Sequence, residues 1–244
     1  MVFVFTQSLN AQGQSTAISP ADSAKAIEGF ITASGGSGMF YQYSHTVLPG
    51  KRYPPEQQKR PISQDTSTTS VTEAGNLRNE FTQGGIKSIY IRHSNQPKYD
   101  IYLHPQSNAY ELHSIDSSDG GVTYSAIKIG SETIQGYACI HARLIMTITV
   151  PKPGIPSQRA LDLWMSQDVP GYPAYKQLAA KAIDGGRSLT PKMMKTLEQA
   201  GCTGFIVKLE NSAVYQSSVM LLIHAEQKSF PSSAFEIPPG YLKW

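Results

Sequence analysis

Segments that alternate apolar and polar residues follow one another along most of this chain, and this feature constrains its fold most. Within residues 76–227, short runs of this kind are separated by turn signals such as Gly84-Gly85. Strands at this spacing, joined by tight turns, are typical of an antiparallel meander. A similar segment precedes them, with Met39, Tyr41 and Tyr43 on one face. We therefore predict one large antiparallel sheet of about eight to eleven strands.

Three helices are predicted to accompany the sheet. The first spans residues 20–32, and the second opens at Pro173. Thr190-Pro191 supplies the N-cap and first residue of the third, and Gly201 ends it. The apolar stripe of this last helix consists of Met193, Met194 and Leu197.

The chain shows no internal repeat and no linker between two domains. We predict a signal-peptide remnant over residues 1–11, a helix with a linker over 12–38, and one domain over 39–244. Residues 49–75 are rich in Pro, Gln, Ser and Thr and have almost no apolar pattern. Such a composition predicts a long loop or a disordered insertion.

The first residues, MVFVFTQSLNAQ, favour export of the protein. Ala11-Gln12 resembles a cleavage site, although the basic start of a secretory signal is missing. The alternative is an ordinary N-terminus. No run approaches the roughly 20 apolar residues of a transmembrane helix. We expect a soluble periplasmic or secreted protein without a transmembrane segment. In an exported protein, the pair Cys139 and Cys202 suggests a disulfide. The alternative is that both are small buried thiols.

Charge and motifs exclude several function classes. A net charge of +3 is too mild for the basic face of a nucleic-acid binder, so no nucleic-acid partner is expected. The stretch GGSGM at 35–39 misses the nucleophile-elbow pattern, and the chain has no phosphate-binding loop. None of the histidines are paired four residues apart on a helix, although a hairpin could bring His104 and His113 together. We expect no metal site, no cofactor and no catalytic residues, and therefore no enzyme.

What remains is a set of strands and helices with bulky apolar faces. Helices rich in Ala, Met and Leu are available to cover the apolar face of the sheet. This surface either forms a dry core or lines a cavity for an apolar ligand, and the pattern is the same for both. The residues that we single out as cavity-lining candidates are Tyr41, Tyr43, Ile89, Ile91, Trp164, Met193, Met194 and Leu197.

Two stretches carry a resemblance to a known family. They are the segment around Trp164 that continues into Asp168-Val169-Pro170-Gly171-Tyr172, and the ending FEIPPGY at 235–241. From Met39 to Tyr241 the chain resembles a family of exported bacterial proteins of unknown function that is similar to the LolA-like superfamily of periplasmic lipoprotein carriers. The 49–75 stretch departs from this pattern.

The resemblance implies an α+β fold. It would be a strongly curved antiparallel sheet that forms an incomplete (half) barrel, with helices covering the concave side. In the carriers, that cavity holds acyl chains. FEIPPGY is then expected to be a last short strand, in which residues 233–235 pair at a sheet edge before Pro238 and Pro239 end the ladder.

Two hypotheses follow. The first is an exported, soluble, non-catalytic binding protein that holds a hydrophobic ligand, namely a lipid, a lipoprotein acyl chain or a lipidated peptide, in the half-barrel cavity. The second is a structural or protein-interaction module of the cell envelope without a small ligand. Its partner would be another envelope protein, and its working surface would be the 49–75 loop or an exposed sheet edge. We also predict a disulfide between Cys139 and Cys202.

Overall fold

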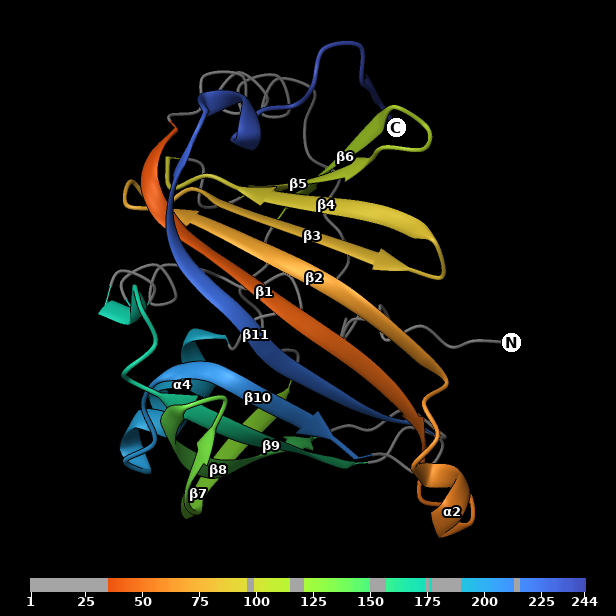
Figure 1. The fold of residues 1–244 in the computed structure, drawn as a ribbon, viewed down its shortest axis with the longest axis vertical. Helices are drawn as coiled ribbons and strands as arrows, with labels where there is room; N and C mark the ends of the chain where they lie inside the picture. The colour runs from red at the N-terminus through yellow and green to blue at the C-terminus, as the bar shows by residue number, and fades with distance from the viewer. Residues whose placement is uncertain are drawn as a thin grey trace.

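The computed structural model describes residues 35–95, 99–114, 121–149, 157–173, 176, 190–212 and 216–244. These residues form a 12-stranded sheet with the order β12-β6-β5-β4-β3-β2-β1-β11-β10-β9-β8-β7 (Figure 1). All neighbouring strands are antiparallel except β12 and β6, so the antiparallel prediction is confirmed. The strands are β1 (Gly36–Pro49), β2 (Ser63–Thr72), β3 (Leu77–Gln83), β4 (Ile86–Arg92), β5 (Tyr99–His104), β6 (Ala109–Ser114), β7 (Val122–Ile134), β8 (Tyr137–Ile148), β9 (Gln158–Ser166), β10 (Phe205–Asn211), β11 (Gln216–Phe230) and β12 (Leu242–Lys243).

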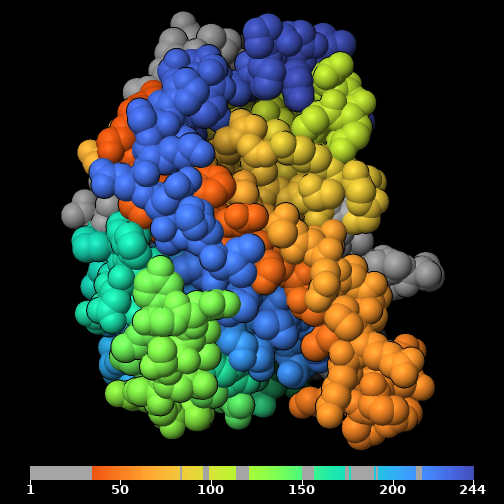
Figure 2. Space-filling model, viewed as in Figure 1, coloured from red at the N-terminus to blue at the C-terminus, as the bar shows by residue number. Residues whose placement is uncertain are grey.

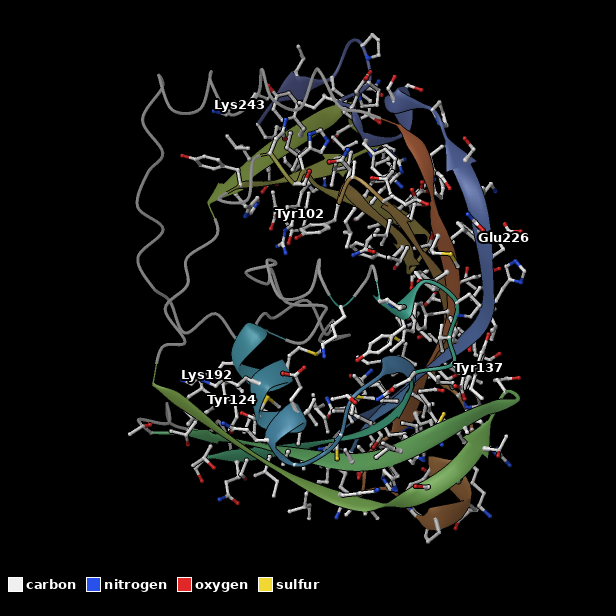
Figure 3. The ribbon with its side chains drawn as sticks, turned by 90° about the vertical axis from the view of Figure 1, so that its left-hand side faces the viewer. Tyr102, Tyr124, Tyr137, Lys192, Glu226 and Lys243 are labelled. Atoms are coloured by element: carbon white, nitrogen blue, oxygen red, sulfur yellow. The ribbon has the colours of Figure 1, made fainter. Side chains whose placement is uncertain are left out.

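The sheet is open and curved. In Figure 3, β1 and β11 form its back, and Tyr102 and Tyr124 point to the concave side while Glu226 points to the convex side. Register shifts at Gln42/Tyr43 and at Ile206/Lys208 interrupt the ladders of the central strands. Such bulges bend a strand and increase its local twist, which contributes to the curvature.

Helix α4 (Pro191–Gln199) forms where the sequence predicts it. The Thr190 side chain accepts a hydrogen bond from the backbone N–H of Met193, and Gly201 follows the helix with a φ of +70°. The N–H of Cys202 donates to the carbonyl of Leu197, which is the bond that such a glycine cap makes. No helix in the described ranges is long and apolar enough to cross a membrane. The helix predicted over 20–32, and most of the one opening at Pro173, lie outside the described residues.

The α4 helix packs on β7, β8 and β9. Buried Met193 and Leu197 share a cluster with side chains from these strands, including Leu144 and Leu163. Met194 is partly buried beside them. Figure 3 shows this helix on the concave side of the sheet. One half of the concave surface is therefore apolar and covered by a helix.

The ending of the chain covers the convex side of β4 and β5. Phe235 is fully buried against a row of aliphatic residues from these strands: Ile89, Ile91, Ile101 and Leu103. In Figure 2 the C-terminal segment (dark blue) lies at the top of the molecule, next to these strands (yellow). The predicted edge strand over 233–235 is wrong, since Ser232–Phe235 forms a short 3-10 helix, η1. The chain turns there because Phe235 inserts into the apolar cluster, and it rejoins the sheet only as β12.

The prediction of a loop over 49–75 is wrong for its second half. Residues 63–72 form β2, which pairs with both β1 and β3. Its sequence is mostly Ser and Thr, so apolar alternation is absent, yet Thr suits a pleated strand and the backbone supplies the ladder bonds. The short helix α2 (Pro55–Gln58) lies in the remaining connection.

We predict that Phe235→Ala lowers the free energy of unfolding by about 3–5 kcal/mol, because it leaves a cavity under the chain ending. Chemical denaturation followed by circular dichroism measures this loss. The control is Leu242→Ala, since Leu242 is 73% exposed and its truncation should cost under about 0.5 kcal/mol. Equal losses for the two variants would show that the ending does not seal the sheet.

Candidate functional site

One row of paired residues defines the concave side of the sheet. Residues paired across antiparallel strands share a face, and the pairing runs from β1 to β5 through Tyr41, Thr69, Asn79, Tyr90 and Tyr102. Since Tyr102 points to the concave side in Figure 3, Tyr41 does so too. The aromatic residues of β1 therefore face the interior of the curve.

A tight turn lies against this aromatic face. The N–H of Tyr172 donates to the carbonyl of Val169 at 3.2 Å, and Gly171 has a φ of +77°. Pro followed by Gly with positive φ is the signature of a type II turn. The Tyr41 hydroxyl donates to the carbonyl of Pro170 at 2.9 Å, which ties the turn to β1. The Val169–Tyr172 turn is thus held over the central strands.

A pocket of about 200 Å³ opens between this turn and the strands. Its floor includes Met39 and Val71, which are paired across β1 and β2. A Cβ on Gly171 would lie 2.2 Å from Met39 Cγ and 2.8 Å from the Tyr41 hydroxyl oxygen. A glycine is therefore required there both for the turn and for the space beside it. The described residues that line it are Gly38, Met39, Tyr41, Val71, Thr72, Glu73, Gly171 and Gln227.

The concave face of β4 and β5 is polar instead. Arg92 binds Asp100 through two hydrogen bonds of 2.8 Å, and both residues are buried. Burial raises the pKa of Asp100, and the bonds from Arg92 oppose this shift. Burial also raises the pKa of Tyr90 well above its usual value, so its hydroxyl stays neutral. The two charges neutralise each other within the sheet.

Two histidines meet at one carboxylate on the same side. His104 Nε2 lies 3.0 Å from Glu111 Oε1, and His113 Nε2 lies 2.7 Å from Glu111 Oε2. Trp244 packs on the His104 ring, and Tyr102 packs on the His113 ring. Within the described ranges, no group of three His, Cys, Asp or Glu side chains is arranged to hold a metal ion. The β5–β6 hairpin brings these histidines to a shared partner as hydrogen-bonding groups.

The predicted cavity residues are divided among several clusters. Tyr41 and Tyr43 stack with Phe205 at centroid distances of 4.3 and 6.3 Å. Met193, Met194 and Leu197 lie together in the α4 cluster. Of the predicted set, only Tyr41 lines the pocket.

Three other predicted residues lie on the opposite face. Ile89 and Ile91 flank Tyr90 along β4 and pack with Phe235 on the convex side. Trp164 is on the face of β9 opposite Leu163, stacked on His141 at 4.2 Å and covered by the Lys208 ammonium. Its indole N–H donates to Glu132.

Sequence reasoning missed most of the pocket. Val71 and Glu73 belong to the segment that the sequence predicts as a loop. Gln227 is a single polar residue in a strand, and no sequence motif marks it as part of a binding site. Gly171 had a usable signal, because a Pro-Gly pair marks a turn that brings backbone close to its surroundings. A glycine at such a position indicates that the turn packs closely against another element. It does not indicate which strand that element is.

The predicted disulfide is wrong, because Cys139 and Cys202 are both free thiols. Cys139 is buried beside Trp164 and Val207, whereas Cys202 is buried beside Leu197 under α4. Burial raises the pKa of both thiols. Each cysteine therefore behaves as a small apolar core residue.

We predict that neither thiol reacts readily in the native protein, since both are buried and their raised pKa values disfavour the thiolate. After unfolding without reductant, both should be alkylated by iodoacetamide. Intact-mass spectrometry counts the added groups. A protein that takes up label only after reduction would contain the disulfide that this structure lacks.

We predict that Asp100→Asn lowers the free energy of unfolding by about 3–5 kcal/mol, because it leaves the Arg92 charge buried without a counter-charge. Urea denaturation at neutral pH measures the loss. Glu226→Gln is the matched control, since Glu226 forms surface pairs that are worth about 0–1 kcal/mol. Similar losses in both variants would contradict the interpretation.

Comparison with known proteins assigns the chain to a family. Residues 66–241 match the family described as Domain of unknown function (DUF4412). No curated protein matches. Similar solved structures include lipoprotein LppX of Mycobacterium tuberculosis, with 13% identity over 82% of this chain and 88% of that one and a TM-score of 0.34. A domain described as an outer membrane lipoprotein-sorting protein from Vibrio parahaemolyticus has 9% identity over 87% and 94%, with a TM-score of 0.32.

LprF of Mycobacterium bovis has 12% identity over 84% of this chain and 90% of its own, with a TM-score of 0.29. The family match covers well over half of the sequence, from β2 through the turn at Tyr241. This chain is therefore a member of the DUF4412 family.

Proposed function

We propose that this chain is an exported, non-catalytic binding protein that holds the aliphatic part of a hydrophobic ligand on the concave side of its sheet. The ligand would be a lipid, an acyl chain or a lipidated peptide. The observation that carries this proposal is the pocket of about 200 Å³ between the Val169–Tyr172 turn and the faces of β1 and β2. In this account the open sheet acts as a half-barrel.

The chemistry of the pocket supports an apolar guest. Met39, Tyr41 and Val71 supply much of its wall, and Met side chains adapt to irregular shapes. Ligand pockets are typically concave and mostly apolar, with volumes of about 300–1,000 Å³ for drug-sized molecules. The smaller volume suits the end of one chain. The rest of a larger ligand would extend over the concave surface.

The neighbouring charges also fit this use. Arg92 and Asp100 neutralise each other on the concave face of β4 and β5. An apolar chain passing over this surface would meet a closed ion pair, which needs no further counter-charge. The ordered polar face beside the pocket therefore does not require an ionic ligand.

A second candidate is an envelope interaction module, and one observation favours it. The β7 strand ends the described sheet, and Ile127 and Ile129 on it are 49% and 47% exposed. The hairpin of β7 and β8 stands at the surface in Figure 2 (green, lower part). Exposed edge strands with apolar residues are ready to pair with another chain. The two candidates make different predictions for protein-bound lipid.

The test is native mass spectrometry of protein purified from an exported, detergent-free preparation. We expect an added mass of lipid size that is lost on denaturation. Met39→Trp should fill the pocket and weaken lipid affinity roughly tenfold, the loss that about 1.4 kcal/mol of binding free energy represents. Phe40→Trp is the control, because residue 40 lies on the opposite face of the same strand. Thermal unfolding verifies that both variants fold.

Three results would count against the proposal. They are a clean apo mass that does not change after incubation with mixed lipids, equal lipid loss in both variants, or no loss in Met39→Trp. The first would favour the interaction module with β7 as its working edge. The second would show that the site lies elsewhere.

A further inference from the structure

We propose that the pocket beside Met39 selects an amphiphile with an aliphatic chain and a cationic end. This inference rests on the proposed function, because it concerns the same pocket. Among the described residues that line it, Glu73 is the one acidic or basic side chain. Glu73 is exposed at the end of β2, whereas Val71 two residues earlier is buried in the wall. The pocket therefore runs from an apolar floor to an anionic rim.

Hydrogen bonds fix this rim to the start of β1. The backbone N–H of Glu73 donates to the carbonyl of Ser37 at 2.9 Å. Across the pocket, the Gln227 amide donates to the Ser37 hydroxyl at 3.3 Å. The backbone of Glu73 and the side chain of Gln227 are thus both bound to Ser37, and Gln227 adds a neutral polar group beside the pocket. The backbone of Glu73 is therefore held at the rim by its bond to β1.

Two basic residues on the described strands beside the pocket, Lys228 and Arg78, interact with groups away from it. Lys228 lies 3.7 Å from Glu226 and covers the Phe40 ring. Both partners are on the convex side, since Phe40 and Glu226 form a cross-strand pair and Glu226 points that way in Figure 3. Arg78 binds Glu80 and the carbonyl of Ala234. Within the described part of the chain, no ion pair involves Glu73, so its charge is available to a ligand.

The charge of Glu73 is therefore expected to determine which ligands the pocket prefers. An ammonium end seated at the rim would be attracted to the Glu73 carboxylate, and a carboxylate end would be repelled by it. Each effect is worth roughly two- to fivefold in affinity for an exposed pair. Together they predict roughly a tenfold preference for the cationic ligand over the anionic one. Because the rim is exposed, added salt should weaken this preference.

The experiment measures three ligands with the same chain length on the full-length protein. Dodecylamine, dodecanol and dodecanoate displace N-phenyl-1-naphthylamine from the protein at pH 7.5, in low and in high salt. The variants are Glu73→Gln and Glu73→Lys, with Glu56→Gln as a control for net charge. Glu56 is an exposed residue of α2 and does not line the pocket.

We expect dodecylamine to bind the unmodified protein roughly tenfold more tightly than dodecanoate at low salt. Glu73→Gln should remove the preference, Glu73→Lys should reverse it, and Glu56→Gln should leave it unchanged. Dodecanol affinity should be the same in all four proteins. This pattern would show that the rim charge selects the ligand.

Other outcomes overturn the inference in distinguishable ways. If all three ligands bind with the same affinity, or if Glu73→Gln keeps the preference for dodecylamine, the charge of Glu73 does not determine which ligand binds. Only this inference then fails. If dodecanol displaces no probe, or if Met39→Trp leaves its affinity unchanged, the pocket does not hold aliphatic chains. The proposed function then fails together with the inference.

Discussion

The pairing of β1 with β11 is the interaction on which the rest of this structure depends. These are the two longest strands among the described residues, and their ladder runs from Gly36 and Phe230 to Pro49 and Gln216. On one side β1 leads to β2 through β6, and on the other β11 leads to β10 through β7. Each strand alternates between the two sides of the sheet, so this ladder presents Tyr41 to the concave side and Phe40 to the convex side. A single junction therefore joins two differently built halves.

The two halves bury their apolar residues on opposite faces. Beyond β11, the aliphatic side chains lie under α4 on the concave side. Beyond β2, those of β4 and β5 lie on the convex side under the chain ending, which leaves Arg92 and Asp100 on the concave side. The pocket forms where the halves meet, beneath the Val169–Tyr172 turn. A second Pro-Gly-Tyr turn, at Pro238–Tyr241, brings the chain ending back to the sheet. Both stretches on which the sequence resemblance rests therefore contain the same kind of turn.

Much of the fold can be predicted from the sequence, because most strands and the ends of α4 depend on residues that are close together in the chain. Alternation identifies most strands, and Thr190, Pro191 and Gly201 mark the ends of α4. The β2 strand was missed because a Ser/Thr-rich strand between two partners needs no apolar stripe. The faces of Ile89 and Trp164 were misassigned since alternation separates two faces without saying which is concave. The cysteines could not be assigned from spacing, because a disulfide requires close Cβ atoms and not only two thiols.

Photo-crosslinking with a diazirine-bearing fatty alcohol, followed by peptide mass spectrometry, tests the central claim most directly. Because the probe carries no charge, its binding reports on the apolar part of the pocket and does not depend on the charge of Glu73. The account predicts that labelled peptides come from Met39–Tyr41, from Val71–Glu73 and from the Val169–Tyr172 turn, which lie together around the pocket. Labelling confined to the exposed β7 edge, or spread evenly over the chain, would contradict it.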